Sequence, residues 1–518
     1  MRKIALLLLS VSLLAAKDDE DAKKPKPRFP LGKETTYVTE PLDTDGYIDY
    51  AAALNERLRR DVTPENNANV LIWKALGPRS EGAPMPEEFF KWLEIKPPPE
   101  VGDYFIPMGR YAREQLKLAP RPGVIAIQEE LSLCSQRAWK ASEHPNIAAW
   151  LKANEKPLAV ALEATKRTHY YSPLVSKRTR KEPEPLFLAL MPSMEQCRRL
   201  AQALAARAFL RIDEGRFEDA WQDLLACHRI GRHLAQGAAN IELLVGIIID
   251  SNAGRADLAF LERAHLKSEQ INKCLRDLRA LPPMPVAADK MDLGERFMIL
   301  DVVVILDRDG VESLVAAQEE EQFLRFFQRK PNYESTLRNV NHLYDRMAKA
   351  MRGKDRKTRQ KELAPIGKEL AELDMKIPKL RPTKLELLLS KDRDKIVGEY
   401  IGNLVIGSLT PAVHRVQNAS DQCEQNQNNL YLAFALAAYH RDHGRYPKEL
   451  GALAPKYLDR IPDDVFSEKP LIYRPDENGY LLYSVGVNGQ DEQGRTSDDQ
   501  PQGDDLSIRM PLPKLKQK

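Results

Sequence analysis

The residues with the clearest chemistry are acidic side chains that gather near the end of the 518-residue chain. Residues 486–505 contain six carboxylates and four glycines, with hardly an apolar side chain among them. Calcium takes about six to eight oxygen ligands, and glycines allow backbone carbonyls to turn toward a cation. Because carboxylates repel one another without a cation, this loop is the candidate metal site, and the alternative is a solvated acidic loop that binds nothing tightly. The acids are Asp491, Glu492, Asp498, Asp499, Asp504 and Asp505.

Motifs for other kinds of site are missing from the sequence. The nine histidines form no HExxH pattern, and the chain contains no GxSxG, no GxxxxGK[ST] and no GxGxxG after a strand. His440 and His443 lie one helical turn apart and could hold a metal, but no third ligand is visible, so a structural or exposed role is favoured. The sequence therefore identifies no reaction, and the interpretation favours a protein that is not an enzyme.

The elements that must position the acidic loop are a long helix and a small antiparallel sheet. Apolar residues recur at helical spacing from 412 to 443, and Gly444 and Pro447 end that helix. Asn478-Gly479 predicts a hairpin turn between two short apolar runs. The predicted order is a helix over Ala412–His443, a short helix over Lys448–Leu453, strands over Leu471–Tyr473 and Tyr480–Val485, the acidic loop, and a closing strand over Leu506–Met510.

This order, and four short motifs within it, resemble the C-terminal domain of the major pseudopilins, the G-like proteins of type II secretion systems. The motifs are HGRYP at 443–447, PKYL at 455–458, YSVGVNG at 483–489 and GDD at 503–505. The resemblance covers about the last fifth of the chain. It departs from that family in two ways: the helix is internal rather than N-terminal, and Asn488 stands where the family has an aspartate.

The pseudopilin resemblance implies calcium as the cofactor and a set of ligands for it. The Val485 carbonyl, Asn488 and Asp504 match the family's loop, and Asp491 and Asp499 are further candidates. The segment before the long helix, 397–411, is too short and too interrupted to span a bilayer, which takes a helix of about 20 apolar residues. Assembly into a pseudopilin-like fibre is therefore the less favoured of the functions that the resemblance suggests.

The first residues have the layout of a secretory signal. Arg2 and Lys3 precede an apolar core at 4–14, and Ala15-Ala16 precede a charged break. We expect export to the periplasm or the extracellular space, with a short uncleaved membrane anchor as the alternative. After cleavage we expect no transmembrane span. No cysteine stands at the cleavage point to accept a lipid.

The middle of the chain is predicted to be helical. Residues 203–230 resemble one tetratricopeptide hairpin, but no second copy follows at the period of about 34 residues that such arrays have. Pro282–Pro285 is the predicted internal break. The predicted regions are a signal peptide at 1–16, a disordered linker at 17–36, a mainly helical domain at 37–281, a charged helical region at 286–411, an α+β domain at 412–510 and a tail at 511–518.

The composition restricts the class of partner. Positive and negative charges nearly cancel, at a net +3, and the basic runs are short and interleaved with other residues, which argues against nucleic acid. The five cysteines are far apart with no CxxC spacing, so they predict neither a zinc site nor a dense disulfide framework. The fold class expected is mainly α, with a small α+β domain at the C-terminal end.

Two functions from different classes follow from these features. The favoured one is an exported, non-enzymatic binding or scaffold protein of the bacterial cell envelope, with protein partners and a calcium-stabilised C-terminal domain. The alternative is an exported hydrolase with a site in a cleft among the helices of Ser193–Leu306. Converging histidine, serine or carboxylate groups in a pocket would favour the hydrolase.

Overall fold

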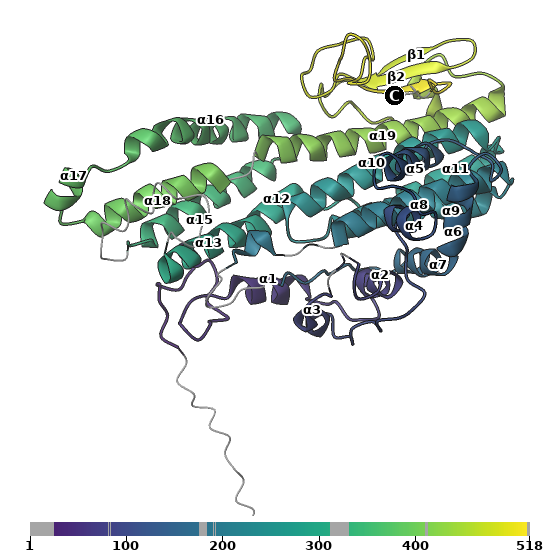
Figure 1. Cartoon of the computed structure of the whole chain (residues 1–518). Coiled ribbons are helices and arrows are strands. Elements are labelled where there is room, and N and C mark those ends of the chain that lie inside the picture. Colours follow the sequence, from purple (N-terminus) through teal and green to yellow (C-terminus); the bar gives the residue numbers. More distant parts are fainter. Residues whose placement is uncertain are drawn as a thin grey trace, which may run out of the picture.

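The protein is mainly helical, with one small antiparallel sheet near its C-terminal end, as the sequence predicts (Figure 1). The predicted signal peptide and the first part of the predicted linker lie outside the described residues. Within the part that is described, no helix combines the length and apolar character needed to cross a membrane. The computed structural model describes residues 25–80, 82, 84–175, 184–189, 191, 193–310, 331–409 and 413–514.

The N-terminal part consists of short helices joined by turns. In the sequence, Thr63-Pro64 predicts an N-cap followed by proline at the first helical position. The second helix begins later, because the side chain of Asn67 accepts a hydrogen bond from the Asn69 N–H at 3.0 Å and caps the helix there. Thr63 instead belongs to the preceding turn, where its N–H donates to Asn66 Oδ1 at 2.8 Å. The helices are α1 (Tyr50–Leu58), α2 (Ala68–Leu76), α3 (Glu87–Trp92), α4 (Met108–Glu114), α5 (Gly123–Cys134), α6 (Pro145–Ala153) and α7 (Glu155–Ala164).

Four longer helices form the central body: α8 (Ser193–Asp213), α9 (Phe217–Leu234), α10 (Asn240–Arg263) and α11 (Ser268–Arg279). The predicted helical hairpin is present as α8 and α9, and Gly215 makes its turn with a φ of +75°. Buried Asp223 holds the pair together, since it accepts hydrogen bonds from Arg207 at 2.7 Å and from Arg211 at 2.6 Å.

A second group of helices extends the body to one side (Figure 1). The sequence predicts charged, amphipathic helical structure over 354–389. In the structure this stretch is divided at Arg381, which precedes Pro382 and adopts an extended conformation, because a following proline disfavours helix. The group comprises α12 (Ala287–Lys290), a π-helical turn η2 (Met291–Glu295), α13 (Arg296–Asp309), α15 (Glu334–Met351), α16 (Arg356–Leu380), α17 (Lys384–Leu389) and α18 (Arg393–Leu409).

The C-terminal part begins with the longest helix, α19 (Val413–His443), which ends at Gly444 with a φ of +69°. The predicted short helix is a single 3-10 turn, η4 (Leu450–Leu453). The sheet has the order β1-β2-β3, antiparallel throughout, and pairs Tyr480 with both Pro475 and Met510. Its strands are β1 (Ile472–Pro475), β2 (Tyr480–Ser484) and β3 (Leu506–Met510). The three strands are those that the sequence predicts, but β1 begins one residue later and ends two residues later than predicted, and β2 ends one residue earlier.

Two large hydrophobic cores hold most of these elements, and α10 and α19 contribute to both. A smaller cluster around Trp73, Phe89 and Phe90 packs α2 against α3. Val413 and Val416 of α19 pack into the core of α12, α13, α15 and α18, whereas Leu430 to Ala438 pack into the core of α8 to α11. Leu482 and Ile508 of the sheet belong to this second core. The sheet and its acidic loop are therefore fixed on the central body rather than hanging from it.

Candidate metal site

The acidic loop is anchored at both ends, to α19 at one end and to the turn before β1 at the other. Asn429 of α19 donates from Nδ2 to the Leu506 carbonyl at 2.9 Å, where the loop enters β3. At the other end, the buried carboxylate of Asp464 accepts a hydrogen bond from Ser484 Oγ at 2.6 Å and one from the Val485 N–H at 3.3 Å. Because Ser484 also pairs with Leu506 in the sheet, the two ends of the loop are held close together.

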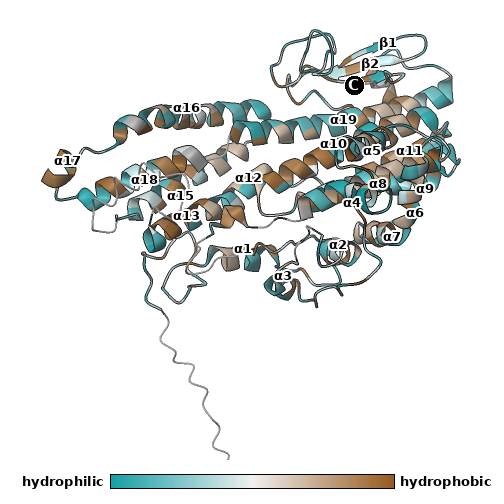
Figure 2. Ribbon diagram, viewed as in Figure 1, coloured by the Kyte–Doolittle hydropathy of each residue, from teal (hydrophilic) through white to brown (hydrophobic). Residues whose placement is uncertain are grey.

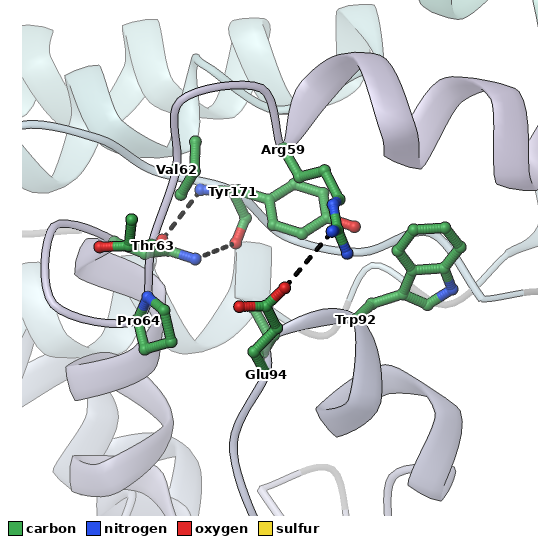
Figure 3. Close-up of a pocket in the computed structure, with 9 residues that line it drawn as sticks. Arg59, Val62, Thr63, Pro64, Trp92, Glu94 and Tyr171 are labelled. Atoms are coloured by element: carbon green, nitrogen blue, oxygen red, sulfur yellow. Dashed lines mark hydrogen bonds and ion pairs between the residues drawn. The ribbon is translucent and has the colours of Figure 1, made fainter.

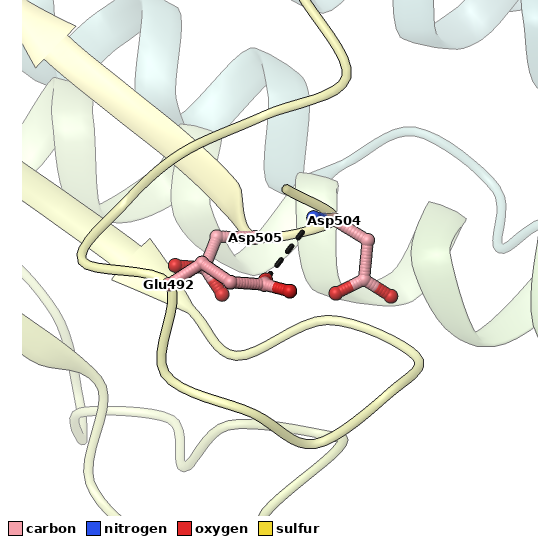
Figure 4. Close-up of side chains that lie close together, drawn as sticks. All are labelled: Glu492, Asp504 and Asp505. Atoms are coloured by element: carbon pink, nitrogen blue, oxygen red, sulfur yellow. Dashed lines mark hydrogen bonds between the residues drawn. The ribbon is translucent and has the colours of Figure 1, made fainter. Parts of the chain in front are cut away.

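Within the loop, three carboxylates converge: those of Glu492, Asp504 and Asp505 (Figure 4). One oxygen from each lies within 4.8 Å of the others. Glu492 Oε2 accepts the Asp504 N–H at 3.1 Å, and Glu492 Oε1 accepts Asn488 Nδ2 at 2.7 Å. Gly486, with a φ of +67°, allows this approach, since a Cβ there would lie 2.2 Å from the Asp504 carbonyl oxygen.

Two carboxylate oxygens of the cluster are buried without a hydrogen-bond partner. Asp505 is 1% exposed; its Oδ2 accepts the Gly494 N–H at 2.7 Å, but its Oδ1 has no partner. Asp504 is similar, since Oδ2 accepts the Asn488 N–H at 2.9 Å and Oδ1 is unpaired. Buried polar atoms in proteins nearly always have a partner, so these two oxygens indicate a missing one.

The electrostatics of the cluster are unfavourable without a cation. Burial raises the pKa of Asp505 to about 6, and the negative charges of Glu492 and Asp491 add to the effect. Burial also raises the pKa of Asp504. In the described part of the chain, no lysine or arginine forms an ion pair with any of the three carboxylates. The cluster has the donor atoms and the charge that a hard divalent cation prefers.

The residues predicted as ligands fall into three groups. Asp504 lies in the cluster, and Asn488 lies beside it as a donor to Asp504 and Glu492. Val485 precedes the loop at the end of β2, where its N–H donates to Asp464. The other two predicted ligands have protein partners outside the cluster: Asp491 accepts the Tyr483 hydroxyl at 2.9 Å, and Asp499 pairs with Arg509 at 2.7 Å.

Sequence reasoning placed Glu492 and Asp505 in the acidic loop but not among the ligands. Asp505 is adjacent to Asp504, and the next residue begins β3, so a paired acid before a strand was the available signal. Glu492 had no such signal, because its place in the cluster depends on how the loop turns at Gly494, where φ is +79°.

A second group of ionisable residues lies in the helices where a hydrolase site was considered. His228 of α9 contacts Asp250 Oδ1 through Nδ1 and Asp257 Oδ2 through Nε2, both at 2.9 Å, and Arg232 donates to Asp250 at 3.1 Å. Burial alone would lower the pKa of His228, but the two aspartates raise it to about 9. The imidazolium is thus enclosed between carboxylates, and at 2% exposure it offers no face to a substrate.

The two surface histidines considered as metal ligands have aromatic neighbours. The ring of His440 lies 4.5 Å from that of Tyr446, and the ring of His443 lies 4.2 Å from that of Tyr439, measured between centroids. These contacts give both histidines a packing role at the end of α19.

Two hollows were considered as ligand sites. One, of about 10 Å³, lies beside Arg59, whose guanidinium is 5.6 Å from the centre of the Trp92 ring and 3.3 Å from Glu94 (Figure 3). It has room for about one water molecule. The other, of about 570 Å³, is lined by Asp292 and Asp345, which both pair with buried Arg296 at 2.7 Å. Neither hollow is lined by the His228 group.

Comparison of the chain with models of known protein families, with curated proteins and with solved structures finds no match. The pseudopilin and tetratricopeptide resemblances therefore rest on the sequence motifs alone and stay predictions.

Proposed function

We propose that this protein is a non-enzymatic scaffold or binding protein of the bacterial cell envelope, whose C-terminal loop holds a structural calcium ion. The observation that supports the calcium site is the pair of buried, unpartnered oxygens on Asp504 and Asp505 beside Glu492. A cation would supply the partner that these two oxygens lack, and no described lysine or arginine forms an ion pair with the three carboxylates.

Calcium suits this cluster better than the smaller magnesium ion. Magnesium demands near-ideal octahedral geometry and gives up its waters reluctantly, whereas calcium accepts irregular oxygen cages. The loop offers three carboxylates, one from its middle and two from its end, with glycine at 486, 489, 494 and 503 to direct carbonyls inward. A bound calcium ion would offset two of the three negative charges and link the middle of the loop, at Glu492, to the start of β3.

The scaffold part of the proposal is supported by the character of the ionisable residues elsewhere. The best convergence of histidine and carboxylates, around His228, is buried and charge-balanced, so it serves the packing of α9 against α10. The smaller hollow has one carboxylate in its lining, Glu94, and the two carboxylates that line the larger one, Asp292 and Asp345, both pair with buried Arg296. A body of this kind presents surfaces rather than a reaction centre.

The direct test is calorimetric titration of the full chain with CaCl₂ and, separately, MgCl₂ after treatment with chelator. We expect one calcium site with a Kd of about 10⁻⁴ to 10⁻³ M, the range of extracellular sites, and little heat from magnesium. Asp505→Asn should abolish the calcium heat. Glu477→Gln, which removes an exposed acid from the hairpin turn of the same sheet, should leave it unchanged.

A second measurement reports on the loop itself. Trypsin can cleave after Arg495, inside the loop, and 1 mM calcium should slow this cut in the wild-type chain but not in Asp505→Asn. If calcium neither binds nor slows this cleavage, the metal site is wrong and the loop is a solvated acidic segment. A calcium response retained in Asp505→Asn would place the ion elsewhere.

A further inference from the structure

Exposed apolar side chains concentrate at the junction of α16 and α17. The described residues include twelve large apolar side chains with high exposure, and five of them fall within residues 375–389. We call these five the apolar tip: Met375, Leu380, Leu385, Leu388 and Leu389. In Figure 1, α17 lies at one end of the elongated body, far from the C-terminal sheet, and Figure 2 shows its apolar colouring.

The exposure of the tip is built into α17 rather than being a frayed end. Leu385, Leu388 and Leu389 share one face of this helix by their spacing, and they are 66%, 63% and 77% exposed. Leu387, on the opposite face, is fully buried in the core. A capping box fixes the first turn, since Thr383 Oγ accepts the Glu386 N–H at 3.2 Å.

Basic residues surround the apolar tip. Residues 375–391 contain five cations and one acid, a local net charge of +4 by 5 − 1; Lys376 among them pairs with Glu372, and Asp374 and Asp392 flank the segment. Lys379, Arg381 and Lys391 are exposed next to the leucines. A continuous apolar face with a basic rim is the pattern by which peripheral proteins insert into the headgroup region of anionic membranes.

We propose that the apolar tip docks this protein reversibly onto an anionic lipid surface. The leucines of α17 would enter the boundary between headgroups and acyl chains, to a depth of about 5 to 10 Å, while the lysines and Arg381 contact lipid phosphates. A convex, protruding leucine face fits a lipid surface, which deforms around it, without the preformed groove that a protein partner would need. The inference is independent of the calcium site and goes beyond the scaffold role.

A fluorescent probe at the tip tests this directly. All five native cysteines are free and buried, so a thiol-reactive NBD probe would label an introduced cysteine selectively. With Leu388→Cys in the full chain, we expect a blue shift of NBD emission on adding vesicles of phosphatidylcholine and phosphatidylglycerol at 7:3. Pure phosphatidylcholine and added salt should weaken the shift. Ile248→Cys on α10, at 53% exposure, is the control and should show no shift.

Vesicle flotation of variants gives the second test. The triple variant Leu385→Ser/Leu388→Ser/Leu389→Ser should lower the partition coefficient onto vesicles by at least about tenfold, because each substitution removes an apolar side chain from the lipid. Lys379→Glu/Lys391→Glu should lower it by a similar factor, and Lys140→Glu/Lys152→Glu, on exposed sites elsewhere, should not. Leu387 is kept in all variants, and circular dichroism checks their folding. The apolar segment at 4–14 is common to all, so differences report on the tip.

Three results would overturn the proposal. The probe at 388 could fail to shift with anionic vesicles, or the triple serine variant could float as well as the wild type. The third result is a shift of the probe emission without vesicles as the protein concentration rises, while the triple serine variant stays monomeric in analytical ultracentrifugation. The tip would then be a contact between copies of the chain.

Discussion

Two groups of buried carboxylates in this protein differ in where their positive charge comes from. Around His228, Asp250 pairs with His228 and Arg232, and Asp257 pairs with His228. In the group around Glu492, one oxygen each of Asp504 and Asp505 accepts a hydrogen bond, and both donors are backbone N–H groups. Both groups contain a buried carboxylate oxygen without a partner. In the first group that carboxylate, Asp257, also contacts the His228 imidazolium, whereas the carboxylates of the second group pair with no cationic side chain among the described residues.

The comparison shows how a structural network is told from a ligand site. Burial raises the pKa of Asp505 and also that of Asp257, whereas the pKa of Asp250 is lowered, because the charges of His228 and Arg232 there overcome the effect of burial. A charge-balanced group stabilises the packing of two helices and is complete by itself. A group with only negative charge is complete only when a cation binds.

The largest effect is expected from removing the cation of the balanced group. His228→Ala should lower the free energy of unfolding by about 3 to 5 kcal/mol, because Asp257 is left as an unpaired buried charge. Urea unfolding followed by circular dichroism measures it, with His342→Ala on the exposed face of α15 as control. A loss below about 1 kcal/mol would mean that the His228 group is not held by charge pairing.

The free energy of unfolding of the wild type should also depend on pH through His228, by somewhat less than His228→Ala changes it. The pKa of His228 is raised from 6.5 to about 9, so its contribution to stability is fully present below pH 6.5 and is lost as the pH rises through 9. Between pH 6.5 and 9.5 the wild type should lose about 2 to 3 kcal/mol more than His228→Gln does. Parallel pH profiles for the two proteins would contradict this assignment.

Calcium affinity should fall on acidification. Asp505 has a pKa of about 6 in the folded protein without metal, so protons compete with the cation below that pH. From pH 7 to pH 5 the Kd should rise about tenfold, which titration calorimetry at the two values can measure. An unchanged Kd would show that Asp505 is not a ligand.

The smallest expected effect is on the free energy of unfolding of the chelator-treated protein, where the sign of the change is informative. Asp505→Asn should stabilise it by about 1 kcal/mol, because a buried charge without a partner is removed. Asp499→Asn in the same loop should destabilise it by about 1 kcal/mol, since Arg509 loses its carboxylate. Urea midpoints of the two variants give the comparison, and equal signs would remove the distinction between paired and unpaired acids.

The elements of the C-terminal part could be predicted from the sequence because their signals are local. Gly444 ends α19, Asn478-Gly479 makes the hairpin turn, and the predicted bounds of β3 agree with the structure. The start of α2 was misplaced because two adjacent stretches, at Thr63-Pro64 and at Asn66-Asn67, carry similar capping chemistry. Only the partner of each side chain decides between them.

The candidate site was predictable as a loop but not as a ligand set. Density of acids and glycines indicated residues 486–505, yet Asp499 and Glu492 look alike in the sequence. Arg509 of β3 takes Asp499, and the turn at Gly494 brings Glu492 to Asp504. Such choices depend on which side chains meet across the loop, and spacing does not record them.

The sequence by itself determined the helical class, the small sheet and the acidic character of the loop, because periodicity, turn residues and charge are properties of neighbouring residues. Tertiary structure alone decided which carboxylates are neutralised by the chain and which are not. It also decided that the leucines of α17 stay outside while Leu387 goes inside. The reason is that burial and charge pairing join residues far apart in the chain, such as His228 with Asp257 and Glu492 with Asp504.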